Sequence, residues 1–425
     1  MTFRPSALAH ALLVLLAWTF CLAILLGRVE LFLVGVPLLV PILRSPPPTQ
    51  TKIRDFRLVV DSGPFMEGEE FGVAVSATVD APSGPVEVLP VLPSLLTSSP
   101  TRPAAAVAPV GDGRIQWSSR HQCRASGRDE LGVVFFRLWD HAGLWVAESR
   151  HEQRTTVTAY PQGTLVRSLP KPRLTGAPFG VHLSRKLGDG TDFADIRQFA
   201  PGDQVRHINW PVSLRMRRLH INQFYTERSG EIIILLDSFS NIGLRPNASL
   251  DHCRRAAASL AMGYLRQHDR VGLMDYGGWI HTTRPAAGPR QYAVILQSLA
   301  RVSIAPSQFL QDLTTLPEPI LPWHALIIAL TPLADPRFAQ MVGRLAEQGR
   351  DVVLLALRTD EICADLAPAM ARRKLTRRFW LLEREQQLRE LRSHGVRAVH
   401  WAPTLPIETA LMTVQRPGVA SQASW

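Results

Sequence analysis

The sequence predicts a membrane anchor, then an all-β, sandwich-like domain, then a doubly wound α/β domain with a mostly parallel sheet. Three patterns support this order. Long apolar runs open the chain, short alternating segments between turn residues follow, and from residue 230 apolar strands alternate with segments of helical periodicity. With 425 residues the chain is long enough for two or three domains, each with its own core.

Residues 1–44 are predicted to form a transmembrane hairpin. The first apolar run, residues 6–26, would span about 30 Å as a helix, which matches the hydrocarbon core of a bilayer. A signal peptide is the alternative, but its apolar region is shorter and ends at a small-residue cleavage site. The second run, residues 31–43, would cover only about 20 Å. It therefore either crosses a locally thinned bilayer or forms a re-entrant or interfacial segment.

Basic residues flank this hairpin unequally. Arg4 precedes it and four basic residues lie between positions 44 and 57, whereas Arg28 is the only one between the two apolar runs. The positive-inside rule therefore predicts a bacterial inner-membrane protein with both ends of the hairpin, and all soluble domains, on the cytoplasmic side.

The middle of the chain is expected to be β-rich. Residues 45–56 form a predicted proline-rich linker. Residues 57–161 alternate apolar and polar side chains in short runs such as 71–79, which is typical of a small antiparallel sandwich. Residues 162–229 are assigned as a junction segment.

Residues 230–413 are predicted to form the α/β domain, and residues 414–425 a tail. Continuous apolar segments favour strands that are covered on both faces. These segments are residues 231–236, 271–274, 325–330 and 351–357. Because segments of helical spacing separate them, the strands are expected to be mostly parallel.

A polar stretch, residues 237–241 (Asp-Ser-Phe-Ser-Asn), follows the first of these strands directly. Ligands bind at the carboxyl ends of strands in such sheets. A carboxylate with hydroxyls close behind it offers the oxygen ligands that Mg²⁺ prefers. Asp237, Ser238 and Ser240 are therefore a candidate metal site, and a polar strand-to-helix turn is the alternative.

A second polar cluster, rich in arginine, lies in the junction segment. Its members are Arg197, Asp203, Arg206, Trp210, Arg215 and Glu227. A nucleic-acid interface would place the arginines on phosphates and stack bases on Trp210, but no known binding module accompanies the cluster. The other interpretations are a structural junction, with arginines paired to Asp203 and Glu227 and Trp210 packed between domains, and a partner-docking surface.

Composition and motifs narrow the class of function. The formal net charge of +11 is compatible with nucleic acid, an acidic partner or an anionic membrane face. Four widely separated cysteines give no zinc spacing and no disulfide framework, which favours a reducing compartment. No HExxH, GxSxG or P-loop motif is present. We therefore expect a protein that is not an enzyme and has no small-molecule substrate. A metal-dependent hydrolase using Asp237 and a membrane-tethered nucleic-acid-binding protein are the alternatives.

The segment 197–227, with its Pro201-Gly-Asp203 turn and Trp210, together with the strand that leads into Asp237, resembles the bacterial domain-of-unknown-function family fifty-eight. The resemblance extends upstream to residues 128–161. It implies a von Willebrand factor A fold for the α/β domain. It also implies an adaptor role beside a cytoplasmic MoxR-type AAA+ ATPase, in the assembly or activation of a complex.

The chain departs from the metal-site pattern that this resemblance implies. Ser238 is not expected as a ligand, and a Thr expected in the second loop is replaced by the stretch at 302–307. After the third strand Thr331 stands where an Asp is expected, and Asp335 comes only later. The resemblance therefore implies a degenerate site, with Mg²⁺ as the one candidate cofactor.

Overall fold

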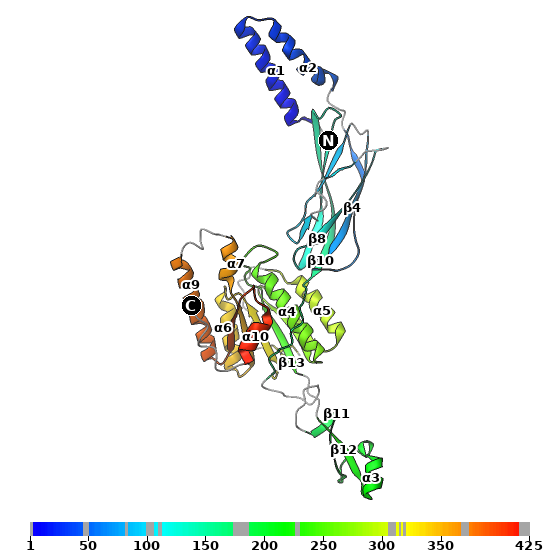
Figure 1. Ribbon diagram of the computed structural model, residues 1–425, viewed down its shortest axis with the longest axis vertical. Coiled ribbons are helices and arrows are strands. Elements are labelled where there is room, and N and C mark those ends of the chain that lie inside the picture. The colour runs from blue at the N-terminus through cyan, green and yellow to red at the C-terminus, as the bar shows by residue number, and fades with distance from the viewer. Residues whose placement is uncertain are drawn as a thin grey trace. The chain divides into compact units, whose positions relative to one another are not determined.

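The computed structural model divides into two compact units, Met1–Ala159 and Tyr160–Trp425. It describes residues 3–45, 51–80, 84–98, 106–108, 113–172, 187–225, 230–304, 312–313, 316–317, 320–366 and 374–415. The first unit contains the apolar hairpin and the β-rich domain, and the second contains the α/β domain with a two-stranded arm (Figure 1).

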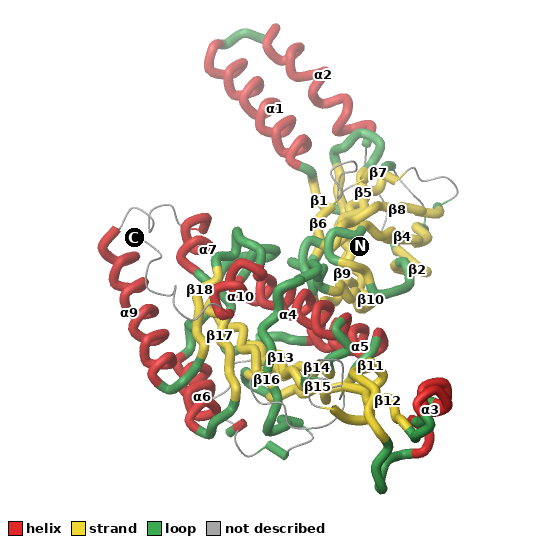
Figure 2. The backbone as a smooth tube through the Cα atoms, turned by 60° about the horizontal axis from the view of Figure 1, so that its bottom comes forward, coloured by secondary structure: helices red, strands yellow, loops and turns green. Residues whose placement is uncertain are grey.

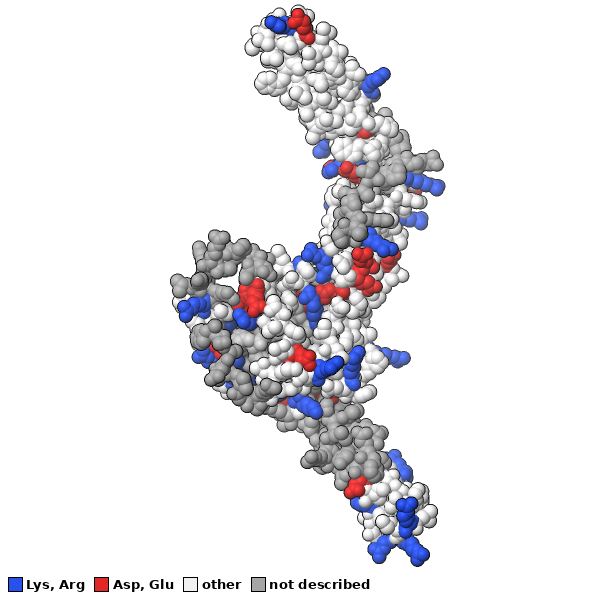
Figure 3. Space-filling view, in the orientation of Figure 1, with Lys and Arg blue, Asp and Glu red and all other residues white. Residues whose placement is uncertain are grey.

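Two helices, α1 (Ala7–Leu26) and α2 (Glu30–Arg44), form the hairpin and lie side by side. Ser6 caps the start of α1, and Gly27 ends it in the left-handed conformation that glycine adopts without strain. Among the described residues, α1 is the one helix long and apolar enough to cross a membrane, and the apolar part of α2 is shorter, Leu33–Arg44. On the face shown in Figure 3 the hairpin is nearly free of charged side chains between its ends.

Two sheets form the β-rich domain. One has the order β1-β10-β9-β5-β7, with β3 also paired to β10, and the other has the order β2-β4-β8-β6. The strands are β1 (Arg4–Pro5), β2 (Ile53–Val60), β3 (Phe65–Met66), β4 (Glu70–Val79), β5 (Val86–Pro90), β6 (Leu96–Ser98), β7 (Ala106–Ala108), β8 (Arg114–Cys123), β9 (Gly127–Trp139) and β10 (Trp145–Tyr160).

Alternation along these strands builds one core between the two sheets. Phe71 and Val73 of β4, Ile115 of β8, and Val134 and Phe136 of β9 are all buried in a single cluster. Because successive side chains of a strand point to opposite faces, the residues between them are left partly or fully exposed.

In the first unit, strands lie in two segments for which none was predicted. β2 begins at Ile53, inside the segment 45–56 that the sequence predicts as a linker. The prolines of that segment favoured a linker, and no alternation of apolar and polar residues indicated a strand, since Arg54 and Asp55 are consecutive polar residues at a shift in the pairing with β4. β1 (Arg4–Pro5) pairs with β10. A two-residue strand carries no periodicity, so nothing in the sequence indicated it.

The described part of the segment predicted as a junction contains two different structures. Residues 161–172 have no regular structure but lie against the α/β domain, where Val166 and Leu169 join its core. The Tyr264 hydroxyl donates a hydrogen bond to the Pro170 carbonyl at 2.6 Å. Residues 187–225 form the arm, which comprises β11 (Leu187–Gln198), η1 (Val205–His207), α3 (Trp210–Met216) and β12 (His220–Tyr225).

A six-stranded sheet of order β15-β14-β13-β16-β17-β18 forms the centre of the α/β domain. The strands are β13 (Glu231–Asp237), β14 (Arg270–Tyr276), β15 (Ile280–Ala286), β16 (Leu326–Thr331), β17 (Asp351–Leu357) and β18 (Arg397–Trp401). All neighbours are parallel except β14 and β15. The mostly parallel sheet is as predicted. The antiparallel strand β15 was missed, because its exposed face interrupts the apolar pattern.

Helices cover both faces of this sheet (Figure 2). They are α4 (Ser249–Arg266), α5 (Pro289–Arg301), α6 (Pro336–Glu347), α7 (Thr359–Leu366), α9 (Lys374–Ser393) and α10 (Ile407–Gln415). Ile232, Ile234 and Leu236 of β13 pack in a cluster with α4, α5 and α10, whereas Ile233 and Leu235 pack in a second cluster with α6 and α9. A strand buried on both faces must be apolar at every position, which explains its continuous apolar run.

Candidate functional site

The carboxyl edge of the sheet gathers polar residues from three adjacent strands. Asp237 ends β13, Asp275 lies one residue before the end of β14, and Thr331 ends β16. β13 lies between β14 and β16 in the sheet, so the three strands are neighbours. The order of the strands along the chain reverses at β13. Ligands of α/β proteins commonly bind at such a reversal.

Asp237 is fully engaged inside the protein. It is 1% exposed. Its Oδ2 accepts a hydrogen bond from Thr331 Oγ1 at 2.5 Å, and its Oδ1 accepts one from Phe239 N at 3.0 Å. Burial raises the pKa of the Asp237 carboxyl to about 7, against the effect of these two donors, and the nearby carboxylates of Asp335 and Asp275 add to the rise.

Ser238 is also bonded within the protein. Its hydroxyl donates to Asp275 Oδ1, and its backbone N–H donates to the Tyr276 carbonyl at 3.0 Å. Burial raises the pKa of the Asp275 carboxyl, which Ser238 and His281 partly offset. A side chain at Gly277 would collide with Ser238, which explains the glycine there.

The contacts of the two residues that follow Ser238 do not indicate a cation site. The buried ring of Phe239 packs edge-on against Tyr276, with ring centroids 5.1 Å apart. The Arg337 guanidinium lies 4.4 Å from the centroid of Phe239 and pairs with Asp335 at 2.6 Å. The Ser240 hydroxyl is buried without a hydrogen-bond partner, so it makes no hydrogen bond to Asp237.

This donor set does not fit a bound divalent cation, which needs several oxygens directed at one point. The oxygens of Asp237 and the hydroxyl of Ser238 point at protein donors and acceptors instead. Within the described ranges, no three His, Cys, Asp or Glu side chains are placed to hold a metal. Binding of Mg²⁺ at Asp237 stays a prediction, and it would require Thr331 or Ser238 to rotate away from its present partner.

Asp275 was not among the residues predicted for this edge, and Thr331 was predicted only as the residue that stands where an Asp ligand is expected. A signal was available for both, since each directly follows an apolar run predicted as a strand. Their proximity to Asp237 depends on the strand order, which the sequence pattern does not give.

The second candidate site is the arm, in which Arg197 and Asp203 fix the turn that follows β11. The Arg197 guanidinium donates to both carboxylate oxygens of Asp203, at 2.6 and 2.7 Å, and Ala200 N donates to Asp203 Oδ2 at 2.7 Å. Asp203 N donates to the Ala200 carbonyl at 3.1 Å, and Gly202 has φ 104°. With Pro201 before Gly202, this is a type II turn. The hydrogen bonds from Arg197 hold the pKa of the Asp203 carboxyl below its usual value.

The short helix α3 is held against β12 by side-chain hydrogen bonds. Asn209 caps its start by accepting a bond from Val212 N at 3.2 Å. Ser213 is buried; its hydroxyl donates to the Asn209 carbonyl at 2.7 Å and accepts from His220 N at 2.9 Å. These contacts fix which face of α3 points outward.

The outward side of the arm exposes large apolar side chains. Trp210 is 58% exposed and Leu214 is 78% exposed. Residues four apart in a helix lie on the same face, and Met216 and Val205 are exposed in the same segment. We call the exposed side chains of Val205, Trp210, Leu214 and Met216 the arm patch.

Basic side chains accompany the arm patch. Arg206 and Arg215, both predicted site residues, are exposed, as are Arg217 and Arg218. Figure 3 shows basic side chains gathered at the end of the arm around uncharged surface. From residue 204 to residue 225 the chain contains no acidic residue. The remaining predicted member, Glu227, lies outside the described residues.

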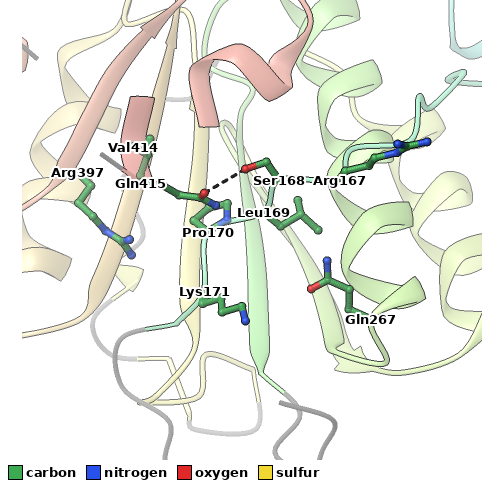
Figure 4. Close-up of a pocket in the computed structure, with 9 residues that line it drawn as sticks. All are labelled: Arg167, Ser168, Leu169, Pro170, Lys171, Gln267, Arg397, Val414 and Gln415. Atoms are coloured by element: carbon green, nitrogen blue, oxygen red, sulfur yellow. Dashed lines mark hydrogen bonds between the residues drawn. The ribbon is translucent and has the colours of Figure 1, made fainter. Parts of the chain in front are cut away.

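A pocket of about 500 Å³ lies elsewhere in the α/β unit (Figure 4). It is lined by Arg167, Ser168, Leu169, Pro170, Lys171, Gln267, Arg397, Val414 and Gln415. Arg397 pairs with Asp351 at 2.6 Å, and Arg167 points away from the other side chains. Because β18 begins at Arg397, the pocket lies at the amino edge of the strands, opposite the edge where α/β sheets bind ligands.

Comparison with known proteins identifies the region that contains both candidate sites. Residues 195–359 match the family described as "Protein of unknown function DUF58". The match begins in β11 and ends just after β17, so it includes the described arm from residue 195 on and the carboxyl edge.

The chain is also similar to mycobacterial proteins whose function is not known. They include the uncharacterized protein Rv1480 of Mycobacterium tuberculosis and the uncharacterized protein Mb1516 of Mycobacterium bovis. Each is 27% identical over 146 residues, which is 34% of this chain and 46% of the relative. The chain thus spans about half the length of these curated relatives.

Proposed function

We propose that this protein is a membrane-anchored adaptor, not an enzyme, and that its arm patch docks a protein partner. The observation that carries this proposal is the exposure of Trp210 and Leu214 on a helix whose orientation is fixed by Ser213. Tryptophan is enriched among the residues that dominate the energy of protein–protein interfaces. An exposed apolar group on a rigid support is what such an interface requires of one partner.

Charge indicates the chemistry of the partner. Four exposed arginines accompany the arm patch, and no acidic residue lies between residues 204 and 225. Complementary charge at an interface speeds association and excludes wrong partners. The partner is therefore a protein with an apolar groove bordered by Asp and Glu.

We further propose that the partner is an AAA+ ATPase of the MoxR type, and that the pair assembles or activates a larger complex. The support is the resemblance of the arm and of the strand before Asp237 to the family described above. We assign the α/β domain to the von Willebrand factor A type on the order of its six strands, with β15 antiparallel at one edge. The excess of basic residues after α2 supports a cytoplasmic position under the inner membrane.

The two alternative functions would use different residues. A metal-dependent hydrolase would use Asp237, whose oxygens are bonded to Thr331 and Phe239. A nucleic-acid-binding protein would use the arginines and stack bases on Trp210. The aliphatic Leu214, the most exposed side chain of the arm patch, favours a protein surface over phosphates and bases.

The test is affinity purification of the full-length protein from native membranes in mild detergent, followed by mass spectrometry. The double variant Trp210→Ala/Leu214→Ala is compared with Trp279→Ala, which removes an exposed tryptophan outside the arm. Loss of an AAA+ ATPase from the arm variant alone is the expected result. Loss of a different acidic protein would retain the adaptor and reject the ATPase.

Equal recovery of all partners from both variants would reject the arm patch as a docking surface. Nuclease treatment separates the nucleic-acid alternative. If association is removed by nuclease and falls steeply with salt, phosphate contacts account for it and the protein interface does not.

A further inference from the structure

The turn between β9 and β10 contacts both ends of the apolar hairpin. The N–H of Ser6, which caps α1, donates to the Leu144 carbonyl at 2.8 Å, and the Ser6 hydroxyl donates to the Gly143 carbonyl at 2.7 Å. At the other end, the Trp145 indole N–H donates to the carbonyl of Ser45, the residue after α2, at 2.8 Å. We call residues 140–145 the anchor turn.

Asp140 is the centre of this anchor turn. It is 3% exposed. One carboxylate oxygen accepts from Trp145 N at 2.8 Å, and the other accepts from the Ser45 hydroxyl and from Ala142 N. A buried carboxylate with three donors is costly to disturb, because each donor would lose its partner. The end of α2 is therefore tied to the same carboxylate that shapes the turn.

The start of α1 is tied to the neighbouring strand as well. Arg4 and Pro5 pair with Val146 and Trp145 as an antiparallel addition to the edge of β10. Ser6 itself is buried. The hairpin and the β-rich domain are thus joined by backbone and side-chain bonds at both ends, and not by one free linker.

Helix lengths then place the anchor turn relative to a bilayer. The 20 residues of α1 span about 30 Å and the 15 residues of α2 about 22 Å. The first length equals the thickness of the hydrocarbon core. With α1 inserted, its cap at Ser6, and the anchor turn bonded to it, lies at the headgroup layer.

We propose that the anchor turn is a membrane-interface clamp that holds both ends of the hairpin at one face of the bilayer and seats the β-rich domain on anionic phospholipid headgroups. This rests on the anchoring role in the proposed function. The residue types fit: tryptophan favours the interface, and the exposed Arg4 and Arg44 carry the charge that phosphates attract. The clamp keeps both ends on one face whether or not α2 reaches the opposite headgroups.

The test places a nitroxide label on the full-length protein in vesicles of phosphatidylethanolamine and phosphatidylglycerol. Ala142→Cys puts the label on the exposed anchor turn, and Thr156→Cys puts it on an exposed position further along β10. Cys21 and Cys363 are replaced by alanine, and Cys123 and Cys253 are buried. Contact with lipid is measured by the response to a lipid-soluble and to a water-soluble relaxation agent.

The expected result is lipid contact for the label at position 142 and none at position 156. Asp140→Ala should abolish the contact at 142 while the protein stays in the membrane fraction, whereas the control Asp129→Ala should not. If Asp140→Ala fails to fold, Ser45→Ala removes one donor only and should still increase the mobility of the label at 142.

Two results would overturn the clamp, and they separate it from the proposed function. If position 142 is as exposed to water as position 156 while the protein stays in the membrane, the clamp is rejected and the anchor stands. If carbonate extracts the protein from the vesicles, the anchor is rejected, and the clamp with it.

Discussion

The carboxyl edge of the sheet and the arm treat their functional groups in opposite ways. At the carboxyl edge, Asp237, Ser238 and Thr331 are buried and bonded to the protein itself. On the arm, the polar groups of Asp203 and Ser213 serve to hold a turn and a helix, while Trp210 and Leu214 face solvent.

This difference indicates where a partner can gain free energy. At the carboxyl edge a ligand would first have to break hydrogen bonds that the protein already makes, which costs about 1–3 kcal/mol for each buried group left unpaired. At the arm patch a partner removes apolar surface from water and breaks no bond within the protein, at a gain of about 25 cal/mol per Å². The proposed function therefore places docking on the arm, although ligands of α/β proteins commonly bind at the edge of the sheet where Asp237 lies.

The largest change in stability is predicted for Asp237, because its carboxyl group is buried. Its folded-state pKa of about 7 lies above its ordinary value of 3.8, so the folded protein keeps a proton that the unfolded chain has lost. The free energy of unfolding of the wild type, relative to that of Asp237→Asn, should therefore be greatest below pH 4. It should fall by on the order of 4 kcal/mol as the pH rises to 7, and then level off.

Denaturant unfolding of the detergent-solubilised protein across this pH range measures the effect. Glu383→Gln, at an exposed position, is the control for loss of one carboxylate. A stability difference between wild type and Asp237→Asn that does not change with pH would mean that Asp237 is hydrated, so that the carboxyl edge would not be the buried region described above.

A smaller effect is expected from Thr331→Val. The variant keeps the shape of the side chain but removes the donor to Asp237 and the acceptor for Leu333 N, which lies 2.8 Å from the hydroxyl. We expect a loss of about 2 kcal/mol from these unpaired buried groups. Thermal unfolding compared with Thr282→Val, on the exposed face of β15, measures it. Equal melting temperatures of the two variants would contradict the hydrogen bonds of the Thr331 hydroxyl at the carboxyl edge.

On the arm, Ser213→Ala should cost about 1 kcal/mol, since it leaves His220 N without its side-chain acceptor. The consequence for binding should exceed the consequence for stability, because α3 loses the contact that orients Trp210. Titration of the purified partner against Ser213→Ala, alongside Ser298→Ala in α5, checks this. Unchanged affinity would show that the orientation of α3 is set by other contacts.

The smallest effect on global stability is expected from Asp203→Ala, because the pair with Arg197 is at the surface. Its local effect should be clear, since the Ala200 N–H and the guanidinium both lose their acceptor. Limited proteolysis should cut this turn faster in the variant at an unchanged melting temperature. A wild-type cleavage rate would indicate that Pro201 and Gly202 suffice to hold the turn.

The sequence predicted those parts of the fold whose signal is local. The apolar runs of α1 and β13 and the alternation in β4 each report burial residue by residue. The arm gave no such signal. β11 contains glycines and charged residues without alternation, and its residues pair with β12 residues that lie 22 (Gln198 and His220) to 38 (Leu187 and Tyr225) positions later in the chain.

The candidate sites show the same limit. Asp237 could be predicted because it directly follows a strand, but its contact with Thr331 depends on β16 lying beside β13. The anchor turn could not be predicted at all, since Ser6 and Gly143 are 137 positions apart. Contacts of this kind follow from tertiary packing, which overrides local preference.

Site-specific photo-crosslinking in native membranes tests directly whether the arm patch docks the partner. A benzophenone amino acid replaces Leu214 in the arm patch, or Trp279 beside the carboxyl edge, in otherwise identical full-length proteins. A discrete adduct to an AAA+ ATPase from position 214, and none from position 279, is the result that we expect. An adduct from position 279 with none from position 214 would place the partner at the carboxyl edge and contradict the proposed function.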